Sequence, residues 1–300
     1  MLDTKKSKSL IEQGLELCMK KSDQYNHTVW EAMQYSLMAG GKRIRPVLLL
    51  WTGLSLGAEE KDLLPFAQSL EMIHTYSLIH DDLPAMDNDD YRRGRLTNHK
   101  VYGEATAILA GDGLLNLAFE TMGEAMTGIL DRQDGSRRLQ NMTKAFAFMA
   151  RCAGPSGMIA GQMADLASEG RQIDIEELTY IEYNKTSQLL MAALVCGGML
   201  AGASNEIIHH LEEAGGALGK AFQIWDDVLD VEGSLEELGK APSSDAANEK
   251  ATFVSCYGLE KAKEEAGRLT AIALENLQVL PGAYGDAVRQ LTAELIKRKN

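Results

Sequence analysis

Apolar residues recur at helical spacing along most of this chain, the pattern of amphipathic helices. Near the start, Leu10, Ile11, Leu15 and Cys18 fall on one side of such a helix. Alanine, leucine, methionine and glutamate, which all favour helix, dominate the intervals between turns. No alternating run of β-branched residues predicts a strand. We therefore expect an all-α protein with helices over residues 7–20, 29–39, 62–83, 104–130, 141–153, 155–168, 175–183, 259–280 and 283–299.

Composition limits how the chain is organised and where it works. Its 300 residues include 6 prolines and no Pro/Gly/Ser-rich linker, which predicts a single domain over residues 1–300. The net charge of −13 argues against a general nucleic-acid or anionic-membrane surface, because both require a basic face. The 4 cysteines have no CxxC spacing, and the segment MLDTKKSKSL lacks the apolar core of a signal peptide. We therefore expect a protein of the reducing cytosol.

The longest apolar run covers residues 189–203. It contains three glycines and is shorter than the roughly 20 residues that span a bilayer. This run predicts a buried core helix, so we expect a soluble protein with no stable membrane insertion.

Residues 70–95 join an apolar helix to a dense cluster of charge. At about 100° per residue, His74, Ser77 and Asp81 share one face of that helix. Pro84 disfavours helix just before it, so the chain should turn there and bring Asp87 back toward Asp81. Carboxylates this close repel one another unless they stay in water or hold cations, and Mg²⁺ is the natural candidate. The charged residues here are Asp81, Asp82, Asp87, Asp89, Asp90, Arg92, Arg93 and Arg95.

A second acidic helix is predicted over residues 221–233. Its polar side chains fall within an arc of roughly 100° on an otherwise apolar helix. Two carboxylate faces on opposite sides of a cavity would form a polynuclear Mg²⁺ site for a diphosphate, because hard cations take oxygen ligands and share them with phosphate. The polar residues of this face are Gln223, Asp226, Asp227 and Asp230.

Basic residues complement these carboxylates at two further places. The segment GGKRIRP, residues 40–46, joins two glycines that can end a helix to three cations and a proline suited to a first helical turn. Such a loop suits a phosphate clamp, although solvated charges in an ordinary capping loop would give the same pattern. Lys185 is expected at a helix start, where the helix dipole disfavours a cation unless an anionic ligand binds.

Five motifs in order carry a resemblance to a known family. They are GGKRIRP at 40–46, DDLPAMD followed by RRG at 81–94, the pair Lys185-Thr186, FQIWDDVLD at 222–230, and Gly239-Lys240. Over nearly the whole chain the sequence resembles the short-chain trans-isoprenyl diphosphate synthases, and among them the bacterial members that form farnesyl diphosphate. The resemblance implies an isoprenoid-synthase-type bundle of ten or more helices around a central cavity, usually a homodimer. It also implies Mg-dependent elongation of dimethylallyl and geranyl diphosphates with isopentenyl diphosphate.

The resemblance assigns roles to individual residues of this sequence. Three Mg²⁺ ions would bind the allylic diphosphate, held by Asp81, Asp82, Asp87, Asp226 and Asp230. The same diphosphate would contact Arg92, Lys185, Thr186, Gln223 and Lys240. Isopentenyl diphosphate would be placed by Lys42, Arg45, His74 and Arg93. The expected catalytic residues are Asp81, Asp82, Asp87, Lys185 and Asp226. His80 is expected to be structural. Gln162 and Asp165 lie near the cavity wall in the family, and we expect them to pack or to support the residues that bind the ligands.

Product length should depend on the floor of the cavity. Ser77 lies one turn before Asp81, about 5.4 Å along the helix, which is close to the length of an isoprene unit. The adjacent bulky residue, Tyr76, should therefore stop growth after few additions. Relatives with a small residue at this position make longer chains, so we expect farnesyl diphosphate.

Two parts of the chain differ from the family pattern or have an uncertain role. The family usually has a glycine near Ser244 and a Thr-Tyr-Pro run where this chain has residues 252–254, TFV, which bears on the geometry of the loop 239–248. The basic ending, residues 296–300, is suited either to fold over the substrate or to complement a helix C-terminus.

Other functions remain open on the sequence. A geranyl or geranylgeranyl diphosphate synthase would carry the same motifs, and so would a non-catalytic regulatory subunit of the family. A class I terpene cyclase needs no isopentenyl site, so Lys42, Arg45 and Arg93 argue against it. A calcium loop beginning at Asp87 would require glycine where Arg92 stands, which excludes that reading.

Overall fold

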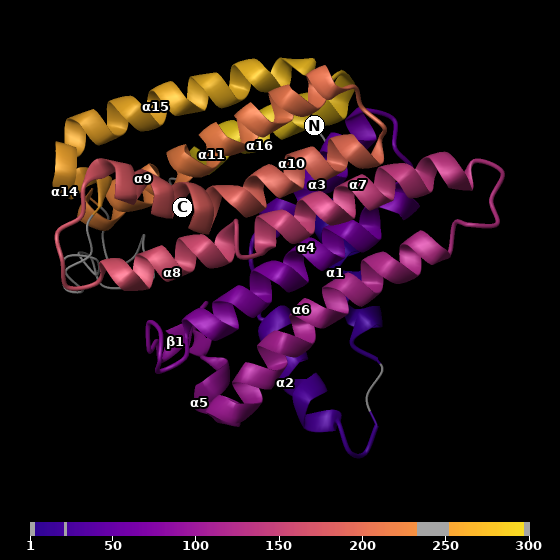
Figure 1. The fold of residues 1–300 in the computed structure, drawn as a ribbon, viewed down its shortest axis with the longest axis horizontal. Coiled ribbons are helices and arrows are strands. Elements are labelled where there is room, and N and C mark those ends of the chain that lie inside the picture. The colour runs from indigo at the N-terminus through magenta and orange to yellow at the C-terminus, as the bar shows by residue number, and fades with distance from the viewer. Residues whose placement is uncertain (1–3, 21–22, 233–251, 297–300) are drawn as a thin grey trace.

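The computed structural model describes residues 4–20, 23–232 and 252–296, and these residues are mostly helical (Figure 1). The expected all-α class, with ten or more helices, is confirmed in this part of the chain. The elements are α1 Thr4–Cys18, α2 His27–Leu37, α3 Ile44–Ser55, α4 Glu60–Asp81, β1 Tyr91–Arg92, β2 Arg95–Leu96, α5 Asn98–Tyr102, α6 Glu104–Thr127, α7 Gly135–Ala153, α8 Met158–Ser168, α9 Ile175–Glu182, a π-helical turn Tyr183–Ser187, α10 Gln188–Leu200, α11 Asn205–Glu232, α14 Phe253–Tyr257, α15 Leu259–Asn276, a 3₁₀ turn Leu277–Val279 and α16 Gly282–Ile296.

Helix α4 lies in the middle of the bundle, with α3, α6 and α10 among the helices packed around it (Figure 1). It is apolar on several sides, and Leu63, Phe66, Leu70 and Ile73 are fully buried. A helix that is apolar nearly all round must be enclosed by other elements. This enclosure fixes the end of α4, where the first acidic segment begins.

Helix α10 is the second central element. All its side chains except that of Met199 are buried, in agreement with the predicted core helix. It packs against α3, α7 and α11, and α11 in turn packs against α15. Within the described residues no helix is long and apolar enough to cross a bilayer.

One tertiary contact explains two errors in the predicted helix ends. The sequence predicted helices over residues 62–83 and 141–153. Instead Glu59 is the N-cap, and Asp62 accepts an ion pair from Arg138 at 3.0 Å. Arg138 makes this contact from inside α7, which begins at Gly135, before the predicted start at residue 141.

A short β-hairpin, which the sequence did not predict, follows the first acidic segment. Tyr91 pairs with Leu96 and Arg92 with Arg95. The two central residues of the turn, Arg93 and Gly94, have φ of 53° and 74°. Positive φ at both positions is the requirement of a type I′ turn, which suits a two-residue hairpin. This turn presents the arginines of the RRG motif.

Candidate active site

The first acidic segment turns back at the end of α4. The amide of Asp87 donates a 2.9 Å hydrogen bond to the carbonyl oxygen of Asp81, which confirms the turn predicted from Pro84. Burial raises the pKa of Asp81, Lys185 lowers it, and Asp87 raises it again. These three charged groups therefore lie within electrostatic range of one another, although they come from two distant parts of the sequence.

Lys185 lies inside a continuous helical segment, so its predicted position at a helix start was wrong. Helix α9 passes through the π-helical turn Tyr183–Ser187 into α10, and the turn therefore has no free N-terminal amides. Two glycines let neighbouring helices approach this turn. A Cβ on Gly161 of α8 would lie 2.7 Å from Lys185 Cα, and a Cβ on Gly219 of α11 would collide with Ser187. Such π turns occur frequently at functional sites.

Polar contacts connect this turn to α11. Thr186 Oγ1 donates to Gln223 Oε1 at 3.0 Å, and Gln223 Nε2 donates to Asp227 Oδ1 at 3.3 Å. The amide of Phe253, at the start of α14, donates to Asp227 Oδ2 at 2.8 Å. Asp227 is therefore a buried acceptor that holds α14, whereas its neighbour Asp226 is only half-buried.

Two further residues were predicted at the site, Asp230 on the second acidic helix and Lys240 just after it. Asp230 is buried on α11, one turn beyond Asp226. Lys240 and the loop 239–248 lie outside the described residues, as does the basic tail 297–300. The metal-binding and diphosphate-binding roles assigned to these residues stay predictions.

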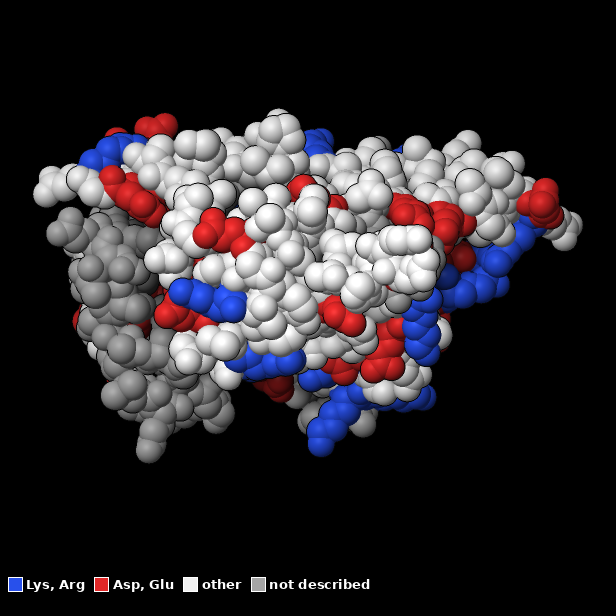
Figure 2. Space-filling model, turned by 90° about the horizontal axis from the view of Figure 1, so that it is seen from below, with Lys and Arg blue, Asp and Glu red and all other residues white. Residues whose placement is uncertain are grey.

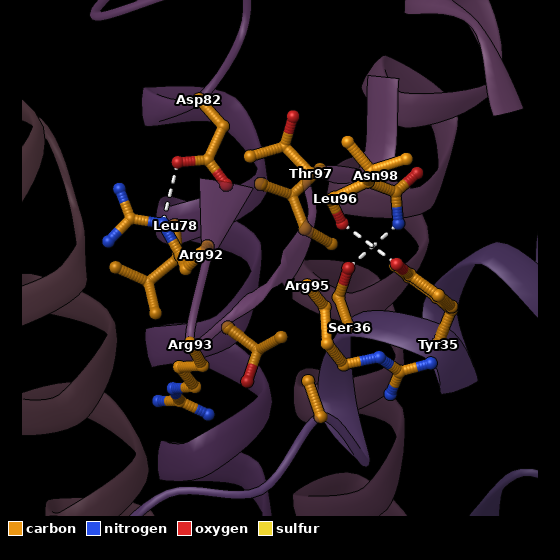
Figure 3. A pocket seen from close by; sticks show the side chains of 13 residues that line it. Tyr35, Ser36, Leu78, Asp82, Arg92, Arg93, Arg95, Leu96, Thr97 and Asn98 are labelled. Carbon is orange, nitrogen blue, oxygen red and sulfur yellow. Dashed lines mark hydrogen bonds and ion pairs between the residues drawn. The ribbon is translucent and has the colours of Figure 1, made fainter. Parts of the chain in front are cut away.

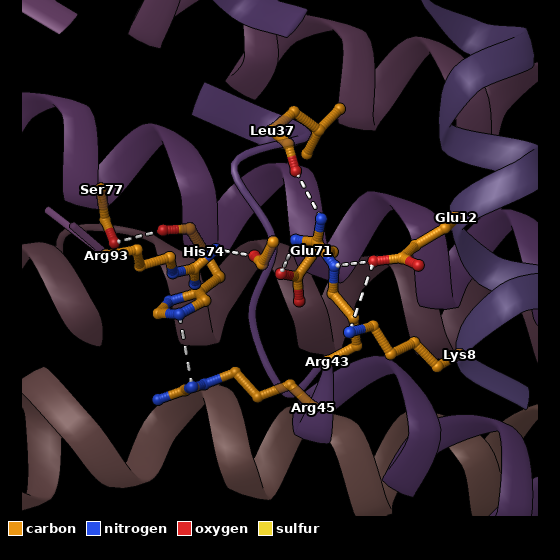
Figure 4. A network of polar contacts seen from close by, with 10 residues as sticks. Lys8, Glu12, Leu37, Arg43, Arg45, Glu71, His74, Ser77 and Arg93 are labelled. Carbon is orange, nitrogen blue, oxygen red and sulfur yellow. Dashed lines mark hydrogen bonds and ion pairs between the residues drawn. The ribbon is translucent and has the colours of Figure 1, made fainter. Parts of the chain in front are cut away.

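The three cations of the loop 40–46 differ in how far they are buried. Figure 4 shows Arg43 beside Glu71 and Leu37. Arg43 is 3% exposed and donates to Glu71 Oε1 at 2.6 Å and to the carbonyl oxygen of Leu37 at 2.6 Å. Lys42 is exposed and Arg45 is half-buried. The expected clamp of three cations is therefore reduced to Lys42 and Arg45, because a buried carboxylate of α4 holds Arg43.

His74 lies beside Arg45 on the same side of α4 as Ser77 (Figure 4). Arg45 Nη1 lies 3.5 Å from His74 Nε2 and must donate to it, because a guanidinium only donates. Burial, followed by the charges of Arg45 and Arg93, lowers the pKa of His74 well below its ordinary value. The imidazole is thus neutral at pH 7 and keeps its proton on Nδ1.

The hairpin places the RRG motif against the end of α4 and against the loop 40–46. Arg92 Nε donates to Asp82 Oδ1 at 2.6 Å (Figure 3), and Arg93 Nη1 donates to the carbonyl oxygen of Gly40. Burial raises the pKa of Asp82 to about 6, against the opposing effect of Arg92. The described contact of Asp82 is with Arg92, and its predicted share in metal binding stays a prediction.

A cavity of about 510 Å³ brings eight of the predicted site residues together. Its walls include apolar side chains of α6, α8, α10 and α11, and along α4 the lining runs from His74 to Asp81. A volume of this size suits a small-molecule ligand with a long apolar part. The predicted site residues that line it are Arg45, His74, Tyr76, Ser77, Asp81, Lys185, Thr186 and Gln223.

Comparison with known proteins identifies the family. The sequence profile described as polyprenyl synthetase matches residues 26–280. This chain belongs to the polyprenyl synthetase family. A farnesyl diphosphate synthase of Geobacillus stearothermophilus is 50% identical over 235 residues, which are 78% of this chain and 77% of that protein. A farnesyl diphosphate synthase of Micrococcus luteus is 47% identical over 256 residues, which are 85% of this chain and 84% of that protein.

A solved structure of the same fold gives an independent comparison. A geranyltransferase from Helicobacter pylori, complexed with magnesium and isoprenyl diphosphate, matches this polyprenyl synthetase with a TM-score of 0.82 and 31% identity. The match covers 98% of this chain and 95% of that one. The isoprenoid-synthase fold and the trans-prenyltransferase class expected from the sequence are thereby confirmed.

The donor set of this polyprenyl synthetase fits a metal shared with a phosphate. Among residues 4–20, 23–232 and 252–296, no three His, Cys, Asp or Glu side chains are grouped closely enough to hold an ion by themselves. Mg²⁺ usually binds one or two carboxylates together with substrate phosphates and waters, so a closed protein cage is not required. Asp87 and Asp165 both raise the pKa of Asp81, and this repulsion is the kind that a cation relieves.

Three residues at the site were not assigned to it from the sequence, because their signals were weak. Asp165 Oδ2 forms a 2.6 Å ion pair with Lys185 Nζ, although the sequence suggested only a packing or supporting role for it. Gln162, one turn earlier on α8, also lines the cavity, and this spacing was the available signal. His80 lines the cavity as well, and nothing in its sequence context distinguishes it from a core histidine.

Proposed function

We propose that this polyprenyl synthetase is a farnesyl diphosphate synthase, which adds isopentenyl diphosphate first to dimethylallyl and then to geranyl diphosphate. The observation that carries the proposal is a cavity of about 510 Å³ that combines cationic, carboxylate and hydroxyl groups with apolar walls. The polar groups suit a diphosphate and the apolar walls suit a prenyl chain. The names of the two curated relatives support the same product.

The allylic diphosphate binds on the side of the cavity formed by Lys185 and Thr186. Lys185 exchanges its ion pair with Asp165 for the diphosphate, and Thr186 adds a hydroxyl donor. Arg92, Gln223 and Lys240 complete this set. The geranyltransferase complexed with magnesium supports the same metal here. We expect three Mg²⁺ ions to be held by Asp81, Asp87 and Asp226 with help from Asp82 and Asp230, and they would neutralise the departing diphosphate.

Isopentenyl diphosphate binds on the side formed by Lys42, Arg45, His74 and Arg93. Arg93 contacts the loop that carries Lys42, so the two basic motifs act on one ligand. His74, kept neutral by its surroundings, donates a hydrogen bond without adding to the repulsion among the arginines. Holding both substrates in one cavity turns a bimolecular encounter into an oriented one.

The reaction follows from this placement. The allylic carbon–oxygen bond breaks and its electron pair leaves with the diphosphate, where Lys185 stabilises the developing negative charge. The double bond of isopentenyl diphosphate then supplies the electrons of the new carbon–carbon bond. The released pyrophosphate takes the proton that the condensed product loses, which restores a double bond.

Tyr76 limits the length of the product. Its side chain is 5% exposed and lines the cavity next to Ser77, which lies about one helical turn from Asp81. Growth therefore meets an aromatic ring after two condensations starting from dimethylallyl diphosphate. Geranylgeranyl or geranyl diphosphate as the main product is the alternative, and product analysis decides between them.

We infer that the enzyme is a homodimer and works in the cytoplasm as a single domain. The face on which α5 and α6 lie has a broad uncharged area between scattered charged groups (Figure 2). Val101 on α5 and Leu109 on α6 are 44% and 59% exposed, and Ile108 is similarly exposed. A second copy of this chain would bury such a face, and sedimentation velocity measures whether it does.

The test of function is product analysis with the purified full chain. Isopentenyl and dimethylallyl diphosphates are supplied with Mg²⁺, and the dephosphorylated products are separated by length. We expect mainly fifteen-carbon product, abolished by EDTA and restored by excess Mg²⁺. Asp81→Asn and Asp226→Asn should each lower kcat by about 10²-fold or more, as expected when an electrostatic group of the transition state is removed.

Exposed Asp131 provides the matched control, and Asp131→Asn should retain the activity of the parent. Prenyl transfer that continued after thorough chelation, or that was unaffected by Asp81→Asn, would overturn the proposed chemistry. A main product of ten or twenty carbons would leave the reaction class in place and replace the product.

A further inference from the structure

His80 occupies a position that the proposed reaction does not explain. It lies on α4 four residues after Tyr76 and lines the same cavity. The two rings meet edge to face, with centroids 5.7 Å apart and an interplanar angle of 80°. Within the described chain the hydroxyl of Tyr76 has no hydrogen-bond partner, so no polar contact fixes the direction of its ring.

The other side of the His80 ring lies against α6. His80 Nε2 is 3.1 Å from the carbonyl oxygen of Ile108 and must carry the proton, because a carbonyl oxygen only accepts. The carboxylate of Asp112 lies 4.0 Å from the same nitrogen. These contacts hold the imidazole in one orientation across the space between α6 and Tyr76.

Gly111 makes this placement possible. A Cβ at this position would lie 2.8 Å from His80 Cε1 and still closer to Nε2 and Cδ2. Real Cβ atoms do not approach other atoms this closely, so any larger residue would displace the ring. The α6 backbone, the imidazole of His80 and the ring of Tyr76 therefore contact one another in that order.

We propose that His80, seated on Gly111, is a positioning residue for product length: it holds the Tyr76 ring in place as the stop for the growing prenyl chain. This inference rests on the proposed elongation reaction. The ligand concerned is the apolar end of an allylic diphosphate, and the specificity is between ten, fifteen and twenty carbons.

The arrangement predicts opposite effects for two substitutions. His80→Ala removes the support behind Tyr76 and deepens the cavity, so the ratio of twenty- to fifteen-carbon product should rise by about 3- to 10-fold, the contribution expected of an aromatic pair. Gly111→Ala pushes the imidazole toward Tyr76 and the cavity, so the ratio of fifteen- to ten-carbon product should fall by about fivefold or more, the lower end of an overpacking effect.

Gly123→Ala is the matched control. Gly123 lies on the same helix α6, and a Cβ there would meet nothing within 4 Å. This variant should keep the product ratio of the parent, and total isopentenyl incorporation is measured for every protein. A residue with a merely structural role would lower the yield without shifting the products in opposite directions.

The outcomes separate this inference from the proposed function. If the parent forms no prenyl product, the function fails. If the parent forms fifteen-carbon product and both His80→Ala and Gly111→Ala give the same ratio as Gly123→Ala, only the role of His80 fails. Should His80→Ala not fold, Gly111→Ala decides alone, because a product ratio unchanged from the Gly123→Ala control overturns the proposal.

Discussion

The buried ion pair between Arg43 and Glu71 joins the loop 40–46 to α4, and its contribution to stability can be tested by substitution. Arg43 is 3% exposed and Glu71 is 2% exposed, and their side chains are 2.6 Å apart. Arg43→Met keeps an unbranched apolar side chain but removes the guanidinium, so it leaves Glu71 buried without this ion pair. We expect a large loss of stability, because an unpaired buried carboxylate has lost its hydration without compensation.

The size of the effect follows from general values. Removing one member of a buried pair costs about 3–5 kcal/mol. An unfolding entropy of about 2.1 cal/mol/K per residue gives roughly 0.6 kcal/mol per degree for a chain of this length. The Tm of Arg43→Met should therefore fall by about 5–8 °C.

Differential scanning calorimetry of Arg43→Met, Lys42→Met and the double variant Arg43→Met with Glu71→Met tests this reasoning. Lys42 is exposed, so Lys42→Met should keep the Tm of the parent while raising KM for isopentenyl diphosphate. The double variant should regain most of the lost stability, because two apolar side chains replace the pair. Equal Tm values for the two single variants would refute the assigned burial of Arg43.

Three further outcomes are expected. Tyr76→Ala should lengthen the main product by one isoprene unit toward twenty carbons, which product sizing measures. The pKa of Glu182 is raised from 4.5 to about 8, mainly by burial and then by Asp227. Its contribution to stability is therefore present below pH 4.5 and is lost as the pH rises through 8, so Glu182→Gln should flatten the fall of Tm between pH 5 and 9. Asp165→Asn should change KM for the allylic substrate more than KM for isopentenyl diphosphate, because Asp165 pairs with Lys185.

Much of the candidate site follows from local features of the sequence. Helical periodicity placed His74, Ser77 and Asp81 on one side of α4, and all three line the cavity. The break at Pro84, after which the amide of Asp87 bonds back to Asp81, also follows from local chemistry. Such features depend on neighbouring residues, so the pattern alone is sufficient to predict them.

Other features depended on partners far away in the chain. Arg43 is buried and Lys42 exposed because Glu71 meets only one of them, and Arg138 meets Asp62 across two helices. The hairpin formed although neither of its strands has an alternating apolar pattern. No local pattern distinguishes these cases, because the free energy of a buried charge depends on which group faces it.

The sequence by itself determined a helical chain with two acidic faces and two basic loops, because periodicity, charge and proline position act over a few residues. Only the tertiary structure decided that Lys185 lies in a π turn that Gly161 of α8 and Gly219 of α11 approach closely. It also decided that His80 packs between Gly111 of α6 and the ring of Tyr76. Both arrangements require close approach of helices from separate parts of the chain. Close packing leaves one position for each side chain, and that position is set by its spatial neighbours.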